Sequence, residues 1–228
     1  QAANKTMGQG GFQEVEQMNL FKDMVCYQEE VRDPSRMAEV LNRVIEKAIR
    51  GSAPAQINVP RDYWTQVIDI ELPPIVRLER QGGGAEAINE AAKLLSNAKF
   101  PVILSGAGVV IGNAIEETKK IAEKLDSPVC SGYQHNDSFP GSHPLAAGPL
   151  GYNGSKAAME LISKADVVLA LGTRLNPFST LPGYGMDYWP KNANIIQVDI
   201  NPDRIGLTKK VTVGISGDAK LVAKQIFE

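Results

Sequence analysis

Cysteine, long apolar runs and an excess of either charge are all scarce in this chain of 228 residues. Its two cysteines, Cys26 and Cys130, are too few for a disulfide framework, so we expect a reducing, cytoplasmic setting. No run approaches the ~18 apolar residues of a membrane-spanning helix, and no membrane contact is expected. The net charge of -2 gives no electrostatic footprint for nucleic acid. These absences leave an ordinary globular protein.

The amino terminus lacks a methionine and any basic-then-apolar targeting pattern, since the chain opens on Gln1-Ala2-Ala3-Asn4. A length of 228 residues has room for one large domain, or for one small domain and part of another. We therefore expect an internal piece of a longer protein.

The clearest structural signal is the segment 165–177, ADVVLALGTRLNP. Residues 167–171 form an unbroken apolar run, which is typical of a strand buried on both faces in a parallel sheet. The run ends in Gly172, Thr173 and Arg174. Ligands of open α/β sheets bind at the carboxyl ends of the strands, so this loop is a candidate site.

Residues 85–228 alternate between expected strands and helices, which predicts an α/β fold with a doubly wound parallel sheet of about five strands. The expected helices are 85–98, one capped by Asn113, 154–164 and 218–227. The expected strands are 100–104, 128–131, 166–171, 195–200 and 211–215, with long loops at 133–151 and 174–192.

Residues 1–65 are expected to hold only part of an α/β domain. A strand at 21–27, a helix that starts at Asp33-Pro34 and stops at Gly51, and a strand at 55–60 form one parallel crossover. Pro73-Pro74 and the three glycines at 82–84 mark a linker at 66–84. The predicted division is therefore 1–65, 66–84 and 85–228.

Several residues are candidates for a nucleotide cleft in the later domain. Gly106, Ala107 and Gly108 follow an expected strand, where glycines let backbone N–H groups approach a phosphate. The match to G-x-G-x-x-G is partial, because Ile111 replaces the third glycine, and a tight turn needs glycine in any case.

The other candidates for this cleft are Thr173, Arg174, Asp199 and Asn201. An acid at a strand end, such as Asp199, binds ribose hydroxyls in dinucleotide folds. The alternative is that Asp199 and Asn201 cap the turn after Pro202. Both interpretations stay open, as does a relic of a nucleotide site.

Other polar and aromatic residues have simpler explanations. His135 and His143 fit no metal-ligand spacing and are expected to pack within their loop, with a catalytic role as the alternative, because loops on α/β scaffolds often carry function. Tyr184, Tyr188 and Trp189 are expected to form the interior of the loop 174–192 or a subunit contact.

Three stretches together resemble one family, the thiamine-diphosphate enzymes such as acetolactate synthase and pyruvate oxidase. Residues 8–14, GQGGFQE, resemble the G-x-x-x-F-Q-E signature of that family's pyrimidine-binding domain, and residues 33–60 resemble the end of the same domain. PVILSGAGV, HPLAAGPLG, ADVVLALGTRL and IIQVDINPDRIG are similar to its Rossmann-like central domain. The resemblance covers essentially the whole chain and is strongest to the branch that acts on sulfoacetaldehyde.

The resemblance implies an acyltransferase that converts sulfoacetaldehyde and phosphate to acetyl phosphate and sulfite through an adduct with thiamine diphosphate, in taurine degradation. It implies thiamine diphosphate and Mg²⁺ in the parent enzyme. It also implies a homodimer or homotetramer, because the family's catalytic centre lies between subunits. Phe12 then packs beside the cofactor, and Gln13 hydrogen-bonds substrate or intermediate, which suits an amide that does not titrate.

Two parts of the family's site are missing here. The glutamate that activates the cofactor lies upstream of the Phe-Gln pair in the family, and nothing before Gly8 supplies it. The diphosphate and metal motif begins with G-D-G, and the nearest match, Gly217-Asp218-Ala219, is expected to be a helix cap. We therefore expect this stretch alone to hold no cofactor and no metal, and to be inactive.

Three alternatives remain for the central domain and its parent enzyme. Some relatives hold FAD or an adenine nucleotide in this domain, but the incomplete glycine fingerprint and the long loop argue against FAD here, and an ADP pocket stays open. The domain is otherwise a non-catalytic nucleotide-binding module, or purely architectural. The parent enzyme is alternatively another acetolactate synthase-like carboligase.

Overall fold

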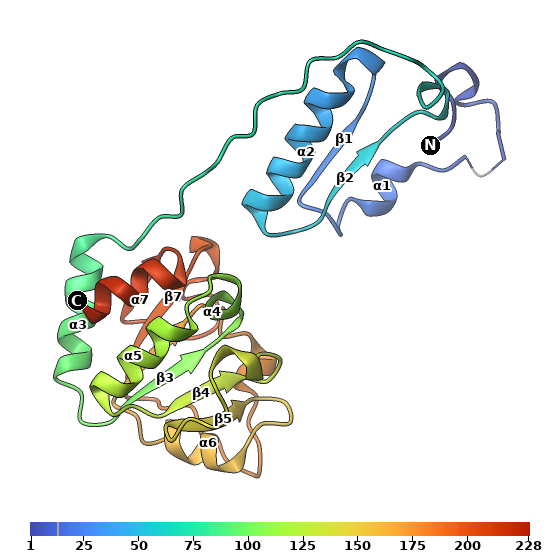
Figure 1. Cartoon of the computed structure of the whole chain (residues 1–228). Helices are drawn as coiled ribbons and strands as arrows, with labels where there is room; N and C mark the ends of the chain where they lie inside the picture. Colours follow the sequence, from blue (N-terminus) through green and yellow to red (C-terminus); the bar gives the residue numbers. More distant parts are fainter. Residues whose placement is uncertain (13) are drawn as a thin grey trace. The chain divides into compact units, whose positions relative to one another are not determined.

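A computed structural model describes residues 1–12 and 14–228 of the chain, which form two compact units. The first unit is Gln1–Arg77 and the second is Leu78–Glu228 (Figure 1). The boundary between them falls inside the linker predicted at 66–84. In the described part of the chain, no helix combines the length and the apolar character that a membrane crossing requires.

The first unit contains the parallel crossover that the sequence predicted. Its elements are η1 (Asn4–Thr6), α1 (Gln17–Phe21), β1 (Tyr27–Glu30), η2 (Pro34–Arg36), α2 (Met37–Gly51), β2 (Ala55–Asn58) and η3 (Arg61–Tyr63). β1 and β2 pair in parallel, and α2 joins them and buries Val40 and Val44 with Val31. Asp33 caps the helical segment as predicted, because its carboxylate accepts from the Ser35 N–H at 2.9 Å.

The strand predicted at 21–27 is wrong, because α1 ends at Phe21 and β1 begins only at Tyr27. β1 consists of Tyr27 and three polar residues, and two of these, Gln28 and Glu29, bond to side chains elsewhere in the unit. Gln28 donates to the Gln56 side chain at 2.7 Å, and Glu29 accepts two hydrogen bonds from the Arg43 guanidinium at 2.8 Å each. A strand stabilised in this way carries no apolar alternation that a sequence pattern would detect.

The second unit is built on a six-stranded parallel sheet with the order β5-β4-β3-β6-β7-β8, which confirms the doubly wound α/β fold. Its strands are β3 (Pro101–Ser105), β4 (Val129–Gly132), β5 (Ala146–Leu150), β6 (Val167–Leu171), β7 (Asn194–Asp199) and β8 (Val213–Ser216). Its helices are α3 (Ala85–Ser96), α4 (Ala107–Ile111), α5 (Ile115–Leu125), α6 (Lys156–Ile162) and α7 (Ala219–Phe227), with short turns η4 (Asn136–Ser138), η5 (Pro177–Thr180) and η6 (Pro202–Arg204).

One strand and one helix of this unit were not predicted. β5 lies in the expected loop 133–151, and its Gly148 and Pro149 are residues that normally indicate a loop. An edge strand tolerates proline because one side of its backbone is unpaired. α4 occupies the turn after β3. Asn113 was predicted to cap the next helix but has a left-handed φ of 53° between α4 and α5, and Ala114 precedes α5 instead.

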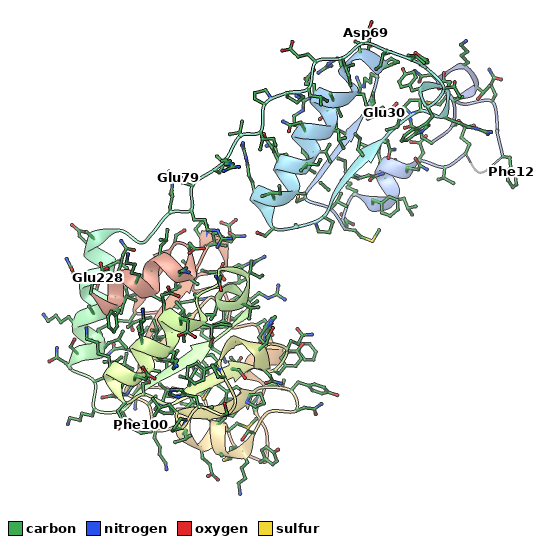
Figure 2. The ribbon with its side chains drawn as sticks, viewed as in Figure 1. Phe12, Glu30, Asp69, Glu79, Phe100 and Glu228 are labelled. Atoms are coloured by element: carbon green, nitrogen blue, oxygen red, sulfur yellow. The ribbon has the colours of Figure 1, made fainter. Side chains whose placement is uncertain are left out.

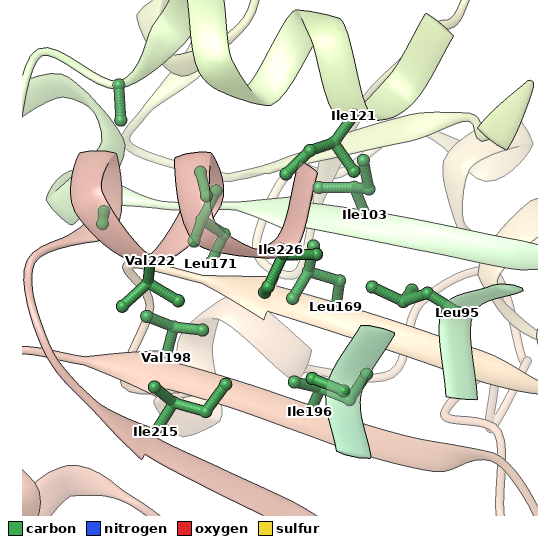
Figure 3. Packing of buried hydrophobic residues seen from close by; sticks show 14 of the residues in the cluster. Leu95, Ile103, Ile121, Leu169, Leu171, Ile196, Val198, Ile215, Val222 and Ile226 are labelled. Carbon is green, nitrogen blue, oxygen red and sulfur yellow. The ribbon is translucent and has the colours of Figure 1, made fainter. Parts of the chain in front are cut away.

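The two faces of the sheet carry separate cores, as expected for strands buried on both sides. Alternate residues such as Ile103, Leu169 and Ile196 face one core, which α3, α5 and α7 cover. Figure 3 shows Val222 and Ile226 of α7 over these strands. Residues one position away, such as Val102, Leu104 and Val168, face the other core.

The second core is covered by α6 and by the loop 174–192. Tyr188 is only 2% exposed and packs in this core with Leu175, and burial raises the pKa of its hydroxyl to about 12. The prediction that the loop's aromatic residues form its interior is thus confirmed for Tyr188, whereas Tyr184 is exposed. This face is therefore covered by one helix and a packed loop, where the other face has three helices.

The end of the predicted linker is bound to α7. Arg80 forms an ion pair with Asp218 at 3.0 Å, and the Gly83 N–H donates to the Gln225 side chain at 2.9 Å. Asp218 also caps α7 as predicted, because its carboxylate accepts from the Lys220 and Leu221 N–H groups.

The two cysteines are expected to differ sharply in reactivity. Cys26 is exposed, whereas Cys130 is fully buried in β4, and burial raises the pKa of its thiol to about 12. Burial disfavours the thiolate of Cys130, and only the thiolate reacts. We expect a disulfide reagent to modify Cys26 in the folded protein and Cys130 only after denaturation, as read by mass mapping. Rapid native labelling of both would contradict this.

Candidate functional site

The strand order places the carboxyl ends of β3, β6 and β7 side by side. The chain leaves β3 towards β4 on one side and reaches β6 on the other, so the β3–β6 pair is the switch point at which open α/β sheets bind ligands. Gly106 follows β3, Thr173 follows β6, and Asp199 ends β7. The structure therefore brings together, at one edge, the residues predicted for a nucleotide cleft.

The glycine turn at this edge is filled by main-chain contacts. The Gly106 N–H donates to the Leu171 carbonyl at 3.0 Å, and the Gly108 N–H donates to the Gly172 carbonyl at 2.8 Å. A Cβ on Gly108 would lie 2.7 Å from the Gly172 Cα. Close packing of the β3–α4 turn on the end of β6 accounts for these glycines, which supports the tight-turn alternative. The Gly106 and Gly108 N–H groups are thus already bonded to backbone carbonyls. Ala107 is the first residue of α4.

A buried amide that the sequence analysis missed organises the same edge. Gln197 is 1% exposed in β7 and donates to the carbonyls of Thr173 and Arg204, at 3.1 Å each. Its side-chain oxygen accepts from the Gly206 N–H at 2.9 Å. The sequence signal that could have identified Gln197 is that it is the one polar residue in the apolar stretch 195–198. Gln197 fixes the loops after β6 and β7 to each other.

The polar residues after β7 serve the local backbone. Asp199 accepts from the Asn201 N–H at 2.9 Å, and Asn201 accepts from the Asp203 N–H at 3.0 Å and caps η6. The capping alternative is thus confirmed for Asn201, while Asp199 holds the N–H of the capping residue itself. Arg174, which follows β6, is exposed. Nucleotide contact by Gly106, Ala107, Gly108, Thr173, Arg174, Asp199 and Asn201 stays a prediction.

The segment 8–14 lies in the first unit. Within it the Glu14 N–H donates to the Gly11 carbonyl at 3.1 Å. Phe12 in the loop is 94% exposed, and Figure 2 shows it projecting from the edge of its unit. Gln13, the other predicted catalytic residue, lies outside the described residues.

The histidine His143 behaves as a packing residue. His143 Nδ1 accepts from the Leu145 N–H at 3.2 Å, its Nε2 lies 3.1 Å from a Glu123 carboxylate oxygen, and its ring packs edge-on against Phe139. Over the described residues, no group of three or more His, Cys, Asp or Glu side chains is placed to hold a metal ion.

Comparison with known proteins identifies the family of this chain. The sequence model of the family "Thiamine pyrophosphate enzyme, central domain" matches residues 88–226, and the chain belongs to this family of thiamine-diphosphate enzymes. It is 80% identical over its whole length to "Probable sulfoacetaldehyde acetyltransferase" of Rhizobium meliloti (strain 1021), of which it covers 39%. It is also 80% identical to "Sulfoacetaldehyde acetyltransferase" of Roseovarius nubinhibens, again over 100% of this chain and 38% of the relative.

Solved structures agree at the level of the fold. The benzoylformate decarboxylase of Polynucleobacter necessarius superimposes on all of this chain with a TM-score of 0.84 at 21% identity, and the chain covers 43% of that structure. The chain therefore spans well under half the length of each of these relatives.

Proposed function

We propose that this chain is part of a sulfoacetaldehyde acetyltransferase, which converts sulfoacetaldehyde and phosphate to acetyl phosphate and sulfite. The observation that carries the proposal is the 80% identity, over the full length of the chain, to two relatives with that printed name. The match covers the whole chain, so it spans the segment 8–14 as well as the central domain.

In the proposed reaction sulfite leaves with the electron pair of the C–S bond of sulfoacetaldehyde. The aldehyde carbon loses its hydrogen as a proton and forms a bond to a phosphate oxygen, and the methylene carbon gains a proton and becomes the methyl group of acetyl phosphate. Thiamine diphosphate, held with Mg²⁺ by other parts of the enzyme, supplies the electron sink for this chemistry. Phe12 packs beside the cofactor ring, and Gln13 hydrogen-bonds the substrate. The enzyme is a cytoplasmic homodimer or homotetramer.

The central domain is proposed to be architectural. The support for this role is that the Gly106 and Gly108 N–H groups, and the Asp199 and Asn201 side chains, already bond to protein backbone.

The test is an assay of the full-length protein with thiamine diphosphate, Mg²⁺, phosphate and sulfoacetaldehyde. We expect sulfite and acetyl phosphate in equal amounts, with acetyl phosphate formed only when phosphate is present. The 228-residue chain alone is the control and is expected to be inactive. Absence of sulfite would overturn the proposal, and condensation of pyruvate to acetolactate in its place would assign the protein to another carboligase of the family.

A further inference from the structure

The glycine-rich residues 8–11 are hydrogen-bonded to one side chain, that of Glu14. The Glu14 carboxylate accepts from the Gly8 N–H at 2.5 Å with one oxygen and from the Gly11 N–H at 3.1 Å with the other. Hydrogen bonds to an ionised carboxylate are roughly twice as strong as neutral ones. One side chain thus joins both ends of the glycine-rich part of the loop.

The glycines of the loop are explained by this arrangement. Gly8 and Gly10 have left-handed φ angles of 79° and 69°, and a Cβ on either would meet no atom within 4 Å. They are therefore required for backbone conformation and not for packing. Their turns point the Gly8 and Gly11 N–H groups at one carboxylate, and the exposed Phe12 follows directly.

We propose that Glu14 is a positioning residue, whose carboxylate fixes the backbone of residues 8–11 and thereby presents the Phe12 ring to the catalytic centre. This inference rests on the proposed function. The hydrogen bonds from Gly8 and Gly11 lower the pKa of Glu14, so the carboxylate stays ionised at neutral pH and the contact is lost only as the pH falls through that lowered value. Glu14 acts through the backbone and touches no reacting atom in this role.

The test compares Glu14→Gln with Glu16→Gln in the full-length protein. The glutamine side chain keeps one oxygen that can accept from one of the two backbone N–H groups, but it places its NH₂ group, a donor, against the other N–H. One of the two hydrogen bonds is therefore lost. Glu16 lies two residues away, is exposed, and its side chain makes no capping hydrogen bond to α1, which makes Glu16→Gln a control for the loss of charge.

Two readouts decide the proposal. Amide hydrogen exchange of residues 8–12 should become faster in Glu14→Gln and stay unchanged in Glu16→Gln. The kcat for sulfite release should fall about tenfold in Glu14→Gln, because displacing a positioned group by ~1 Å can lower the reaction rate by up to ~100-fold. The thermal midpoint should be unchanged, and the KM for sulfoacetaldehyde should change little.

Each other outcome counts against the proposal. Unchanged amide exchange in Glu14→Gln would show that the Glu14 carboxylate does not hold residues 8–11. Faster exchange with an unchanged kcat would show that this contact has no positioning role in the reaction. If the thermal midpoint of Glu14→Gln falls together with kcat, the loss of activity would be explained by lower stability, and Glu14 would have a structural role only. If the wild-type protein releases no sulfite, the proposed function fails and Glu14's part in that reaction fails with it, while the exchange data still decide the loop contact.

Discussion

Gly172→Ala is expected to destabilise the second unit by about 2–5 kcal/mol, combining ~1–2 kcal/mol for a left-handed non-glycine residue with ~1–3 kcal/mol for overpacking. Gly172 has a φ of 60°, and a Cβ there would lie 2.7 Å from the Gly108 Cα and 2.8 Å from the Val109 nitrogen. These are backbone atoms, which cannot rotate away. The β3–α4 turn would have to separate from the end of β6.

The measurement is denaturant unfolding, with Gly206→Ala as the matched control. Gly206 has a φ of 72°, and a Cβ there would meet no atom within 4 Å, so its substitution carries the conformational cost alone. We expect Gly206→Ala to lose about 1–2 kcal/mol. Equal losses in the two variants would show that the close contact between Gly108 and Gly172 contributes nothing to stability.

Gln13→Ala is expected to reduce the kcat/KM of the full-length enzyme for sulfoacetaldehyde by about 10²–10³-fold. Loss of one transition-state hydrogen bond has an effect of about 2.7–4 kcal/mol at its upper end. The role of Gln13 comes from the resemblance of residues 8–14 to the family signature. Folding and thiamine-diphosphate affinity are expected to stay nearly unchanged.

The control for this prediction is Gln9→Ala in the same loop. The Gln9 side chain donates a long hydrogen bond, 3.4 Å, to the Lys5 carbonyl. Turnover in Gln9→Ala should therefore remain close to wild type. A normal rate in Gln13→Ala would exclude Gln13 from the site, and an equal loss in both variants would point to the loop as a whole.

The elements that could be predicted from the sequence are those with an apolar pattern that by itself indicates which residues are buried. The run at 167–171 is buried on both faces and is found as β6, and the apolar spacing of 85–98 is found as α3. β1 was missed because its polar residues are satisfied by partners distant in sequence, such as Gln56 and Arg43. β5 was missed because an edge strand needs neither β-branched residues nor a complete backbone ladder.

The same distinction applies to the candidate site. Its location at the ends of β3, β6 and β7 followed from strand order and was predictable from the alternation of elements. The partners of its polar groups were not, because they depend on register: Gln197 reaches Thr173 and Gly206 only when the folded loops meet. Glu14 belongs to the family motif, but its contacts with Gly8 and Gly11 depend on left-handed turns that sequence spacing does not specify.

The irregular edge strand β5 bears on how copies of this protein avoid unwanted association. An exposed strand edge is a template on which another chain can add a strand, which leads to aggregation or strand exchange. Pro149 has no N–H to offer such a strand, Gly148 has a φ of 96° that interrupts the extended backbone, and the register with β4 shifts at Val129 and Cys130. Copies that meet at this edge must therefore recognise each other through side chains, and not through a sheet continued from one subunit into the next.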